Sequence, residues 1–301
     1  MTGKAERTGL AVLGALTAFL LFSGVDVIMK YLTQRYPLAE VNFLSSAIAM
    51  VPTTLACWLQ NRFQGIRTAA PGPQAARALC SMATGLLVLF AFSRMPIADT
   101  YALAFSAPLF ITALAGPLLR EPVGWRRWAA VGAGFVGILV MLRPGGGAVN
   151  FGALAALGSA VSYALAMLIV RRTQQAGRAA SGSTFAFYSI GFTVLAMGCA
   201  LPFVWVTPAP EHLALVTLSG LMAGSATVLV LSAYTRAPAA VIAPLQYTQM
   251  VWGVVWGWAV FADRPDRFLI LGGVIVIASG LFIRLREWQL GRRIPAVVEP
   301  L

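Results

Sequence analysis

The chain has 301 residues, of which 59% are hydrophobic and only 11% are charged, and it carries a net charge of +12. A soluble globular protein carries roughly 25% charged residues, so this composition excludes a water-soluble domain and predicts an integral protein of the lipid bilayer. The basic residues are spread between apolar runs rather than gathered in one patch, which argues against nucleic acid as a partner.

Ten apolar runs follow one another along the chain, and about 20 apolar residues suffice to cross a bilayer as a helix. The first run follows Lys4 and Arg7 but is too long for a cleaved signal peptide, so we expect a permanent span. The long connection over residues 61–76 contains Pro71 and Pro73, and we expect it to be irregular. The predicted spans are residues 10–31, 38–60, 77–94, 98–119, 127–143, 150–171, 181–204, 212–235, 239–262 and 267–285.

The distribution of lysine and arginine predicts the orientation, because these residues accumulate in cytoplasmic loops. With ten spans, sixteen of the 22 basic residues fall on the side that holds both ends of the chain, and six fall on the other. We therefore expect both termini to be cytoplasmic.

The second half of the chain repeats the first. Residues 91–98 (Ala-Phe-Ser-Arg-Met-Pro-Ile-Ala) match residues 233–240 (Ala-Tyr-Thr-Arg-Ala-Pro-Ala-Ala). Continuing without a gap, Leu103 pairs with Leu245, Phe105 with Tyr247, Ser106 with Thr248, and Glu121 with Asp263. Each half has five spans, an odd number, so the two halves must insert with opposite orientations.

These patterns predict an all-α integral membrane protein with ten transmembrane helices in two inverted five-helix repeats. The first repeat covers residues 1–145, the second covers residues 146–290, and residues 291–301 form a cytoplasmic tail. We expect the repeats to enclose a pseudo-symmetric central cavity, as in transporters.

Several short motifs carry a family resemblance. They are residues 22–26 (Phe-Ser-Gly-Val-Asp), 30–32 (Lys-Tyr-Leu), 108–112 (Pro-Leu-Phe-Ile-Thr), 121–128 (Glu-Pro-Val-Gly-Trp-Arg-Arg-Trp), 134–137 (Gly-Phe-Val-Gly) and 143–145 (Arg-Pro-Gly). The chain resembles the drug/metabolite transporter superfamily, specifically its EamA-type group. The resemblance implies a ten-helix carrier of the bacterial inner membrane with a central cavity. Members move amino acids, nucleotide-like compounds, riboflavin, S-adenosylmethionine or opine-type metallophores, so the resemblance does not fix the solute.

Two positions depart from the pattern of similar chains. The arginine that often follows a Phe-Leu pair in the second span is replaced here by Ser45-Ser46. Any anion contact attributed to that arginine therefore cannot be carried over to this chain. Asp263 lacks the usual preceding glycine, since Ala262 stands there, so we expect this loop to close differently.

Ionisable residues inside a bilayer are costly and face a cavity or one another. Asp26 and Lys30 lie four residues apart on the first span, hence on one helical face. They form either a coupled pair that responds to solute or proton, or a structural ion pair with Lys30 extending to water. Glu121 and Asp263 act either as gating latches or as solvated loop acids beside neighbouring arginines.

Aromatic and amide side chains are the other candidates for solute binding. Aromatic faces with a few polar groups suit an amphipathic organic solute, although such residues also pack against lipid. Amides are expensive to expose to lipid, which favours a cavity position for the two glutamines. With Asp26 and Lys30, the candidate solute-binding residues are Tyr101, Phe105, Tyr163, Gln246, Tyr247, Gln249, Trp252 and Trp256.

Glycine and proline spacings predict close contacts and helix interruptions. Gly220 and Gly224 form one GxxxG motif, and Gly253 and Gly257 form another. Such motifs permit close helix packing, either within one chain or between two copies in a homodimer. Pro108 and Pro244 interrupt two spans, as hinges or cavity walls or as simple kinks.

The sequence favours a secondary carrier of a small organic solute that works by alternating access. It has no GxxxxGK[ST] motif, and its three cysteines and one histidine form no metal-ligand cluster, so we expect no cofactor and no metal. Membrane-embedded acids are scarce, whereas Lys30 and the loop arginines are basic, which favours a zwitterionic or anionic solute over a cation. We expect export of such a solute, of the amino-acid-like or opine type. Uptake of a vitamin or nucleoside-type compound, such as riboflavin or S-adenosylmethionine, is the alternative. Scattered acids argue against an intramembrane enzyme, and a passive channel remains a third class.

Overall fold

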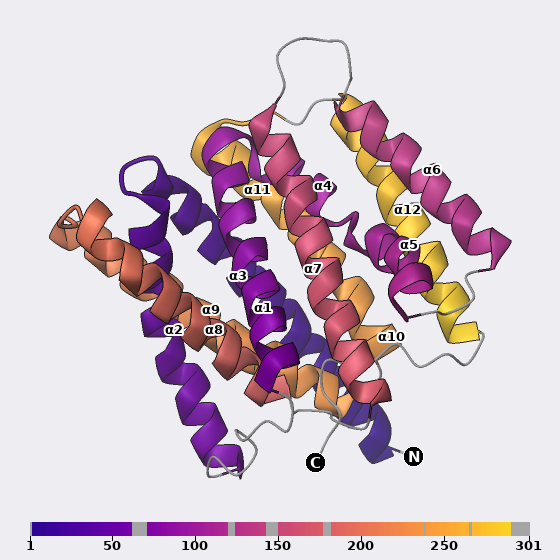
Figure 1. Ribbon diagram of the computed structural model, residues 1–301, viewed down its shortest axis with the longest axis horizontal. Coiled ribbons are helices and arrows are strands. Elements are labelled where there is room, and N and C mark those ends of the chain that lie inside the picture. The colour runs from indigo at the N-terminus through magenta and orange to yellow at the C-terminus, as the bar shows by residue number, and fades with distance from the viewer. Residues whose placement is uncertain are drawn as a thin grey trace.

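The apolar runs become helices in the computed structural model, which describes residues 2–61, 71–119, 124–142, 150–176, 182–237, 239–264 and 267–289. Lipid offers no partner to a free backbone group, so each crossing segment satisfies its own hydrogen bonds as a helix. The first half contains α1 (Thr2–Thr33), α2 (Leu38–Asn61), α3 (Pro71–Arg94), α4 (Ile97–Ala104), α5 (Ala107–Leu119) and α6 (Trp125–Leu142). The second contains α7 (Phe151–Gln175), α8 (Gly182–Val204), α9 (Pro210–Arg236), α10 (Ala239–Ile242), the 3-10 helix η1 (Ala243–Tyr247), α11 (Thr248–Phe261) and α12 (Arg267–Gln289) (Figure 1).

Eight stretches within the described residues are long and apolar enough to cross a membrane, with α4 and α5 together forming one of them. The other two predicted spans correspond to α10–η1–α11, which a 3-10 turn interrupts, and to α12, whose apolar part covers Ile270–Ile283. The predicted all-helical membrane fold is therefore confirmed.

One predicted boundary is wrong. Residues 71–76 were expected to be irregular, but α3 begins at Pro71 and continues through Pro73. Proline is compatible with the first turn of a helix, because the N–H groups there have no intrahelical partner. The rest of this connection, residues 62–70, lies outside the described residues.

The helices pack in a pattern that is symmetric between the halves. α3 packs along α7, and α1 packs along α9. Because the repeat relates α1 to α7 and α3 to α9, these two contacts are equivalent to one another. α2 packs on α8 and α6 on α12, so each of these helices contacts its own repeat equivalent. α4 packs on α11, so the first part of one broken span contacts the second part of the equivalent span. Figure 1 shows α6 and α12 side by side at the edge of the bundle. A two-fold relation between the halves produces this arrangement.

The GxxxG motifs are used inside one chain. A Cβ atom on Gly220 would lie 2.7 Å from the carbonyl oxygen of Ser45, and one on Gly224 would lie 2.5 Å from that of Ala49, so both glycines press against α2. Gly253 of α11 lies equally close to α4. These contacts settle the alternative left open above in favour of packing within the chain, and the homodimer stays a prediction.

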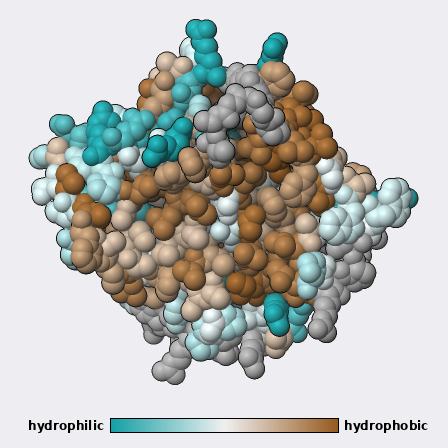
Figure 2. Space-filling view, turned by 45° about the horizontal axis from the view of Figure 1, so that its top comes forward, coloured by the Kyte–Doolittle hydropathy of each residue, from teal (hydrophilic) through white to brown (hydrophobic). Residues whose placement is uncertain are grey.

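The outer surface of the bundle is apolar. Figure 2 shows a broad hydrophobic area across the helices with hydrophilic residues gathered toward the ends. Large apolar side chains such as Leu195, Phe203 and Trp258 are exposed by more than half of their area. Lipid chains are themselves apolar, so such side chains are stable there, and the chain is a multi-pass membrane protein.

Candidate functional site

Two spans are broken at positions that the repeat relates. α4 ends at Ala104 and α5 begins at Ala107, while η1 replaces regular helix over Ala243–Tyr247. The hydroxyl of Ser106 donates a hydrogen bond to the carbonyl of Leu103 at 2.5 Å, and that of Thr248 donates to the carbonyl of Leu245 at 2.6 Å. These are two of the residue pairs that the sequence repeat matched. Equivalent contacts therefore stabilise the two breaks.

A cavity of about 190 Å³ lies beside these breaks. Residues of α1, α3, α4, α5, α7, η1 and α11 line it, so both halves contribute. Pro108 supplies no backbone N–H to the carbonyl of Ala104, and both residues line the cavity. This position favours a cavity wall over a simple kink for the broken span.

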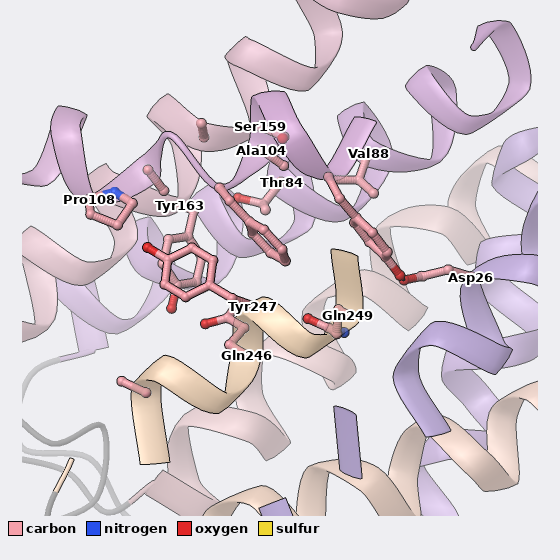
Figure 3. Close-up of a pocket in the computed structure, with 15 residues that line it drawn as sticks. Asp26, Thr84, Val88, Ala104, Pro108, Ser159, Tyr163, Gln246, Tyr247 and Gln249 are labelled. Atoms are coloured by element: carbon pink, nitrogen blue, oxygen red, sulfur yellow. The ribbon is translucent and has the colours of Figure 1, made fainter. Parts of the chain in front are cut away.

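Seven of the ten predicted solute-binding residues line this cavity. Figure 3 shows Asp26 at one end, Pro108 and Tyr163 at the other, and Gln246 and Gln249 along one side. Thr84 and Val88 of α3 also line the cavity, although nothing in the sequence distinguishes them from the other residues of an apolar helix. The seven are Asp26, Tyr101, Phe105, Tyr163, Gln246, Tyr247 and Gln249.

Lys30, Trp252 and Trp256 do not line the cavity. The indole Nε1 of Trp256 donates to the hydroxyl of Ser23 at 3.3 Å and so joins α11 to α1. Trp252 is half-buried. Trp252 and Trp256 lie four residues apart on α11, as expected, but this spacing does not reveal which face of α11 meets the cavity.

The predicted pair between Asp26 and Lys30 is wrong. The Tyr101 hydroxyl donates a hydrogen bond to the Asp26 carboxylate. Lys30 Nζ lies 3.0 Å from Asp263 Oδ2, so each member of the expected pair has a partner on another helix or loop. Among the lining residues that the structure describes, Asp26 is the one with an acidic side chain, and none is basic.

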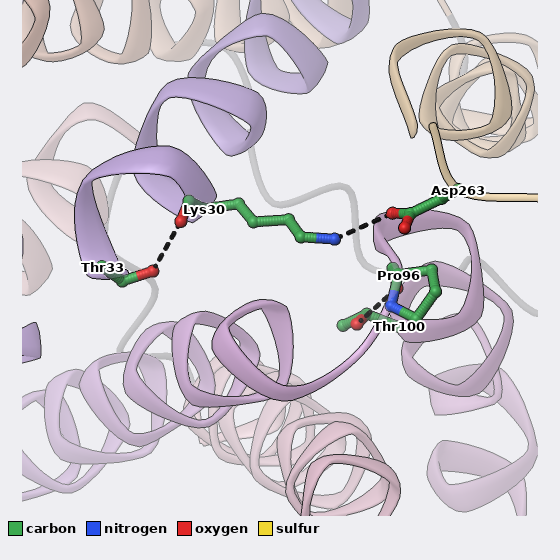
Figure 4. A network of polar contacts seen from close by, with 5 residues as sticks. All are labelled: Lys30, Thr33, Pro96, Thr100 and Asp263. Atoms are coloured by element: carbon green, nitrogen blue, oxygen red, sulfur yellow. Dashed lines mark hydrogen bonds and ion pairs between the residues drawn. The ribbon is translucent and has the colours of Figure 1, made fainter. Parts of the chain in front are cut away.

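The ion pair of Lys30 joins α1 to the end of α11, one helical turn beyond Asp26. Figure 4 shows the lysine side chain reaching from α1 to Asp263. The Lys30 side chain is 7% exposed and the Asp263 side chain 26%, and the ammonium also lies 4.5 Å from the centre of the Phe261 ring. Asp99 of α4 interacts electrostatically with both members of the pair. Lys30 thus neither extends to water nor leaves Asp263 to a neighbouring arginine.

Glu121, the predicted repeat partner of Asp263, lies outside the described residues. Its assignment as a latch or a solvated acid therefore stays a prediction.

Aromatic rings form a continuous wall along the cavity. Tyr101 meets Phe92 edge-on, with ring centres 5.8 Å apart, and stacks on Phe105 at 5.5 Å with an interplanar angle of 5°. Phe105 in turn meets Tyr247 edge-on at 5.5 Å. Phe105 and Tyr247 are repeat equivalents, and two equivalent residues that touch must lie near the axis relating the halves. The cavity is therefore central to the two-fold arrangement.

Two amides complete the polar lining. Gln249 is 8% exposed, and Gln246 is half-buried beside it. No hydrogen bond within the described part of the chain occupies either amide. An amide without a partner is costly in an apolar setting, so these groups are suited to a solute or to water.

The comparisons with known proteins agree with the division of the chain into two halves. The model of the EamA-like transporter family matches residues 9–143 and again residues 150–285, one match in each half. A riboflavin transporter of Rhizobium johnstonii is 28% identical over 97% of both chains. An S-adenosylmethionine uptake transporter of Rickettsia bellii is 28% identical over 88% of this chain and 90% of its own. A pseudopaline exporter of Pseudomonas aeruginosa is 26% identical over 89% and 93%.

A solved crystal structure shares the fold. It covers 93% of this chain and 98% of its own with a TM-score of 0.62, at 18% sequence identity. At this identity, the likeness supports the arrangement of helices and nothing about the solute.

Proposed function

The chain belongs to the EamA-like transporter family and is a secondary transporter of small metabolites, and from that premise we propose that it carries a compact heteroaromatic solute of the vitamin or nucleoside type. We further propose uptake across a bacterial inner membrane by alternating access. This is the alternative that the sequence analysis placed second.

The aromatic wall with two unoccupied amides is the observation that carries this proposal. A flat ring gains by stacking or edge contact with Tyr101, Phe105 and Tyr247, and amides recognise the ring nitrogens and carbonyls at its edge. The names of the riboflavin and S-adenosylmethionine relatives are in keeping with such a solute.

The charge of the cavity also supports it. The expectation of a zwitterionic or anionic solute depended in part on Lys30, but this lysine pairs with Asp263 and does not line the cavity. Asp26 instead gives the lining one acidic group. A neutral ring, or one attached to a positively charged group, suits this environment better than an anion.

The volume limits the size of the solute in this conformation. An apolar cavity of about 150 Å³ holds benzene. At about 190 Å³, the present cavity accommodates a small ring system, and a larger solute requires the walls to separate during the cycle.

Export of an amino-acid-like or opine-type zwitterion is a second candidate. Asp26 is placed to pair with an ammonium group, and the pseudopaline exporter is one of the relatives. The aromatic wall has no evident role for a small aliphatic zwitterion, which is why we place this candidate second.

Counterflow in proteoliposomes tests the proposal. Protein vesicles loaded with unlabelled solute are given radiolabelled riboflavin, S-adenosylmethionine or alanine. We expect saturable, counterflow-stimulated uptake of a heteroaromatic compound. Uptake of alanine alone would establish the second candidate, and flux without saturation or counterflow would indicate a channel.

Asp26→Asn sharpens the test, since it keeps the side-chain shape and removes the charge. Hydrogen bonds to charged groups contribute about 1.5–3 kcal/mol, so transport of cationic S-adenosylmethionine should fall roughly tenfold or more, while neutral riboflavin changes little. Asp99→Asn is the matched control, because it removes a carboxylate outside the cavity. Equal losses for both solutes would contradict the charge assignment.

A further inference from the structure

Two glycines lie directly behind the aromatic wall, although neither lines the cavity. A Cβ atom on Gly280 of α12 would lie 2.8 Å from the Tyr247 hydroxyl oxygen and 3.7 Å from Cγ of Pro108. A Cβ atom on Gly253 of α11 would lie 2.7 Å from Cδ2 of Tyr101. Both tyrosines therefore occupy the space that the side chain of any other residue at position 253 or 280 would need.

Backbone conformation does not explain these glycines. Both lie within helices, and neither has a positive φ. Glycine in a helix interior costs about 1 kcal/mol relative to alanine, so a helical glycine calls for a packing reason. The ring that fits against each of them is that reason.

Their neighbours show which way a displaced ring moves. Tyr247 contacts Phe105, Phe105 stacks on Tyr101, and Tyr101 is held by Asp26. A side chain at position 280 pushes the Tyr247 ring away from α12. The ring then moves toward the cavity that it lines, because Phe105 and Tyr101 are already fixed in contact with one another.

We propose that Gly253 and Gly280 set the width of the cavity and so determine which ring systems enter it. They are positioning residues, since they act through Tyr101 and Tyr247 and touch no solute. The inference rests on the proposed function for the nature of the solute, but the width itself can be measured without any solute.

The first experiment measures that width with thiol reagents. Val88 lines the cavity, so Val88→Cys is introduced after Cys57, Cys80 and Cys199 are replaced by alanine. The purified protein in nanodiscs reacts with a small methanethiosulfonate and with fluorescein maleimide, and the ratio of the two rates reports the access of bulky groups. We expect Gly280→Ala to lower the bulky-to-small ratio about tenfold, the factor that one methylene can impose in an apolar pocket.

Two further variants control this result. Gly132→Ala on α6 is the matched control, because a Cβ atom there meets nothing within 4 Å, and its ratio should not change. Tyr247→Phe removes the hydroxyl that meets the new methyl group, so Gly280→Ala should have little effect in that background. An unchanged ratio in Gly280→Ala, or an equal fall in Gly132→Ala, overturns the proposal.

Failure to fold does not leave the idea untested. If Gly280→Ala does not fold, Tyr247→Phe alone provides the opposite test, since loss of the hydroxyl should widen the cavity and raise the ratio; an unchanged ratio overturns the proposal.

Binding of riboflavin, adenosine and nicotinamide, whose heteroaromatic systems consist of three, two and one rings, is then compared. Gly280→Ala should weaken riboflavin binding most and nicotinamide binding least. If the wild-type protein binds none of the three while the reagent ratio still changes, the proposed function fails and the width assignment stands. Equal weakening of all three by Gly280→Ala overturns the role in selection.

Discussion

A single left-handed residue directs Asp263 toward Lys30. Ala262 has φ 55° and ψ 23°, and the N–H of Asp263 donates to the carbonyl of Gly257 at 2.9 Å, so the chain turns back over the end of α11. This conformation costs a residue with a side chain about 1–2 kcal/mol, whereas glycine adopts it freely. The expectation that this loop closes differently is thus not supported, because Ala262 takes the left-handed conformation that a glycine would adopt, only at a higher conformational cost.

Ala262→Gly should stabilise the protein. Relief of the left-handed strain outweighs the added freedom of the unfolded chain, which leaves a gain of about 0.5–1 kcal/mol in the free energy of unfolding. Thermal unfolding in detergent should show a rise of roughly 1–3 °C in Tm. Ala259→Gly, at an exposed position of α11, is the control and should lower Tm, because glycine weakens a helix interior. A fall in Tm for Ala262→Gly would contradict the strain assignment.

Most of the candidate residues chosen from the sequence line the cavity, because polar groups in an apolar span are costly to expose to lipid and therefore face a cavity or one another. It could not identify the partner of Lys30. That partner depends on the turn at Ala262 and on how α11 lies against α1, and neither is encoded within four residues of the lysine. The face of α11 that carries Trp252 and Trp256 was likewise undetermined, since tryptophan is stable against both lipid and protein.

At the scale of elements, α1, α4 and α11 are held together on one side of the cavity. The Asp26–Tyr101 contact joins α1 to α4, and the Lys30–Asp263 pair joins α1 to the end of α11 one turn farther out. Opening this side in an alternating-access cycle requires the second contact to break. Under the proposed alternating access, we expect the ion pair to belong to the closed state of the side predicted to face outward.

Asp263→Asn should favour the outward-open state. The pair is partly buried, so its loss lies between the values for exposed and buried pairs, about 1–2 kcal/mol. This corresponds to a roughly five- to thirtyfold shift in population. Labelling of Val88→Cys in a cysteine-free background by an impermeant thiol reagent, applied from outside intact cells, should accelerate accordingly.

Arg264→Gln is the matched control for this shift, because it removes a charge from the same loop at an exposed position. Its labelling rate should match that of the parent protein. Equal rates for Asp263→Asn and the parent would show that the ion pair does not restrain the opening.

The helix breaks illustrate what sequence can locate at this scale. Pro108 and Pro244 predicted two interruptions, and both spans are interrupted. The break in the first half lies at Phe105 and Ser106, upstream of the proline, because Pro108 has no N–H to donate to the carbonyl of Ala104. In the second half the 3-10 turn begins at Ala243 and includes Pro244, so the proline marks the broken span but its position relative to the break differs between the halves.

For the whole molecule, the repeat predicted the two-fold arrangement, and the pairing of α1 with α9 and of α3 with α7 agrees with it. The choice of these partners was not predictable. Lipid is as apolar as the protein interior, so hydrophobicity does not distinguish the face of a membrane helix that meets protein from the face that meets lipid. Gly220 and Gly224 mark the face of α9 that meets α2, and such close contacts are recognisable only once the partner helix is known.

The inverted arrangement makes a prediction about Arg94 and Arg236, which occupy equivalent places in the matched octapeptides. Both are exposed, one at the end of α3 and the other at the end of α9. With five crossings in each half, equivalent residues lie on opposite faces, and the distribution of basic residues places Arg94 outside and Arg236 in the cytoplasm. In a cysteine-free background, an impermeant thiol reagent added to intact cells should therefore label Arg94→Cys, whereas Arg236→Cys should react only after permeabilisation. Labelling of both from outside would mean that the two halves share one orientation. The two repeats could not then expose the central cavity to each side in turn by exchanging their conformations.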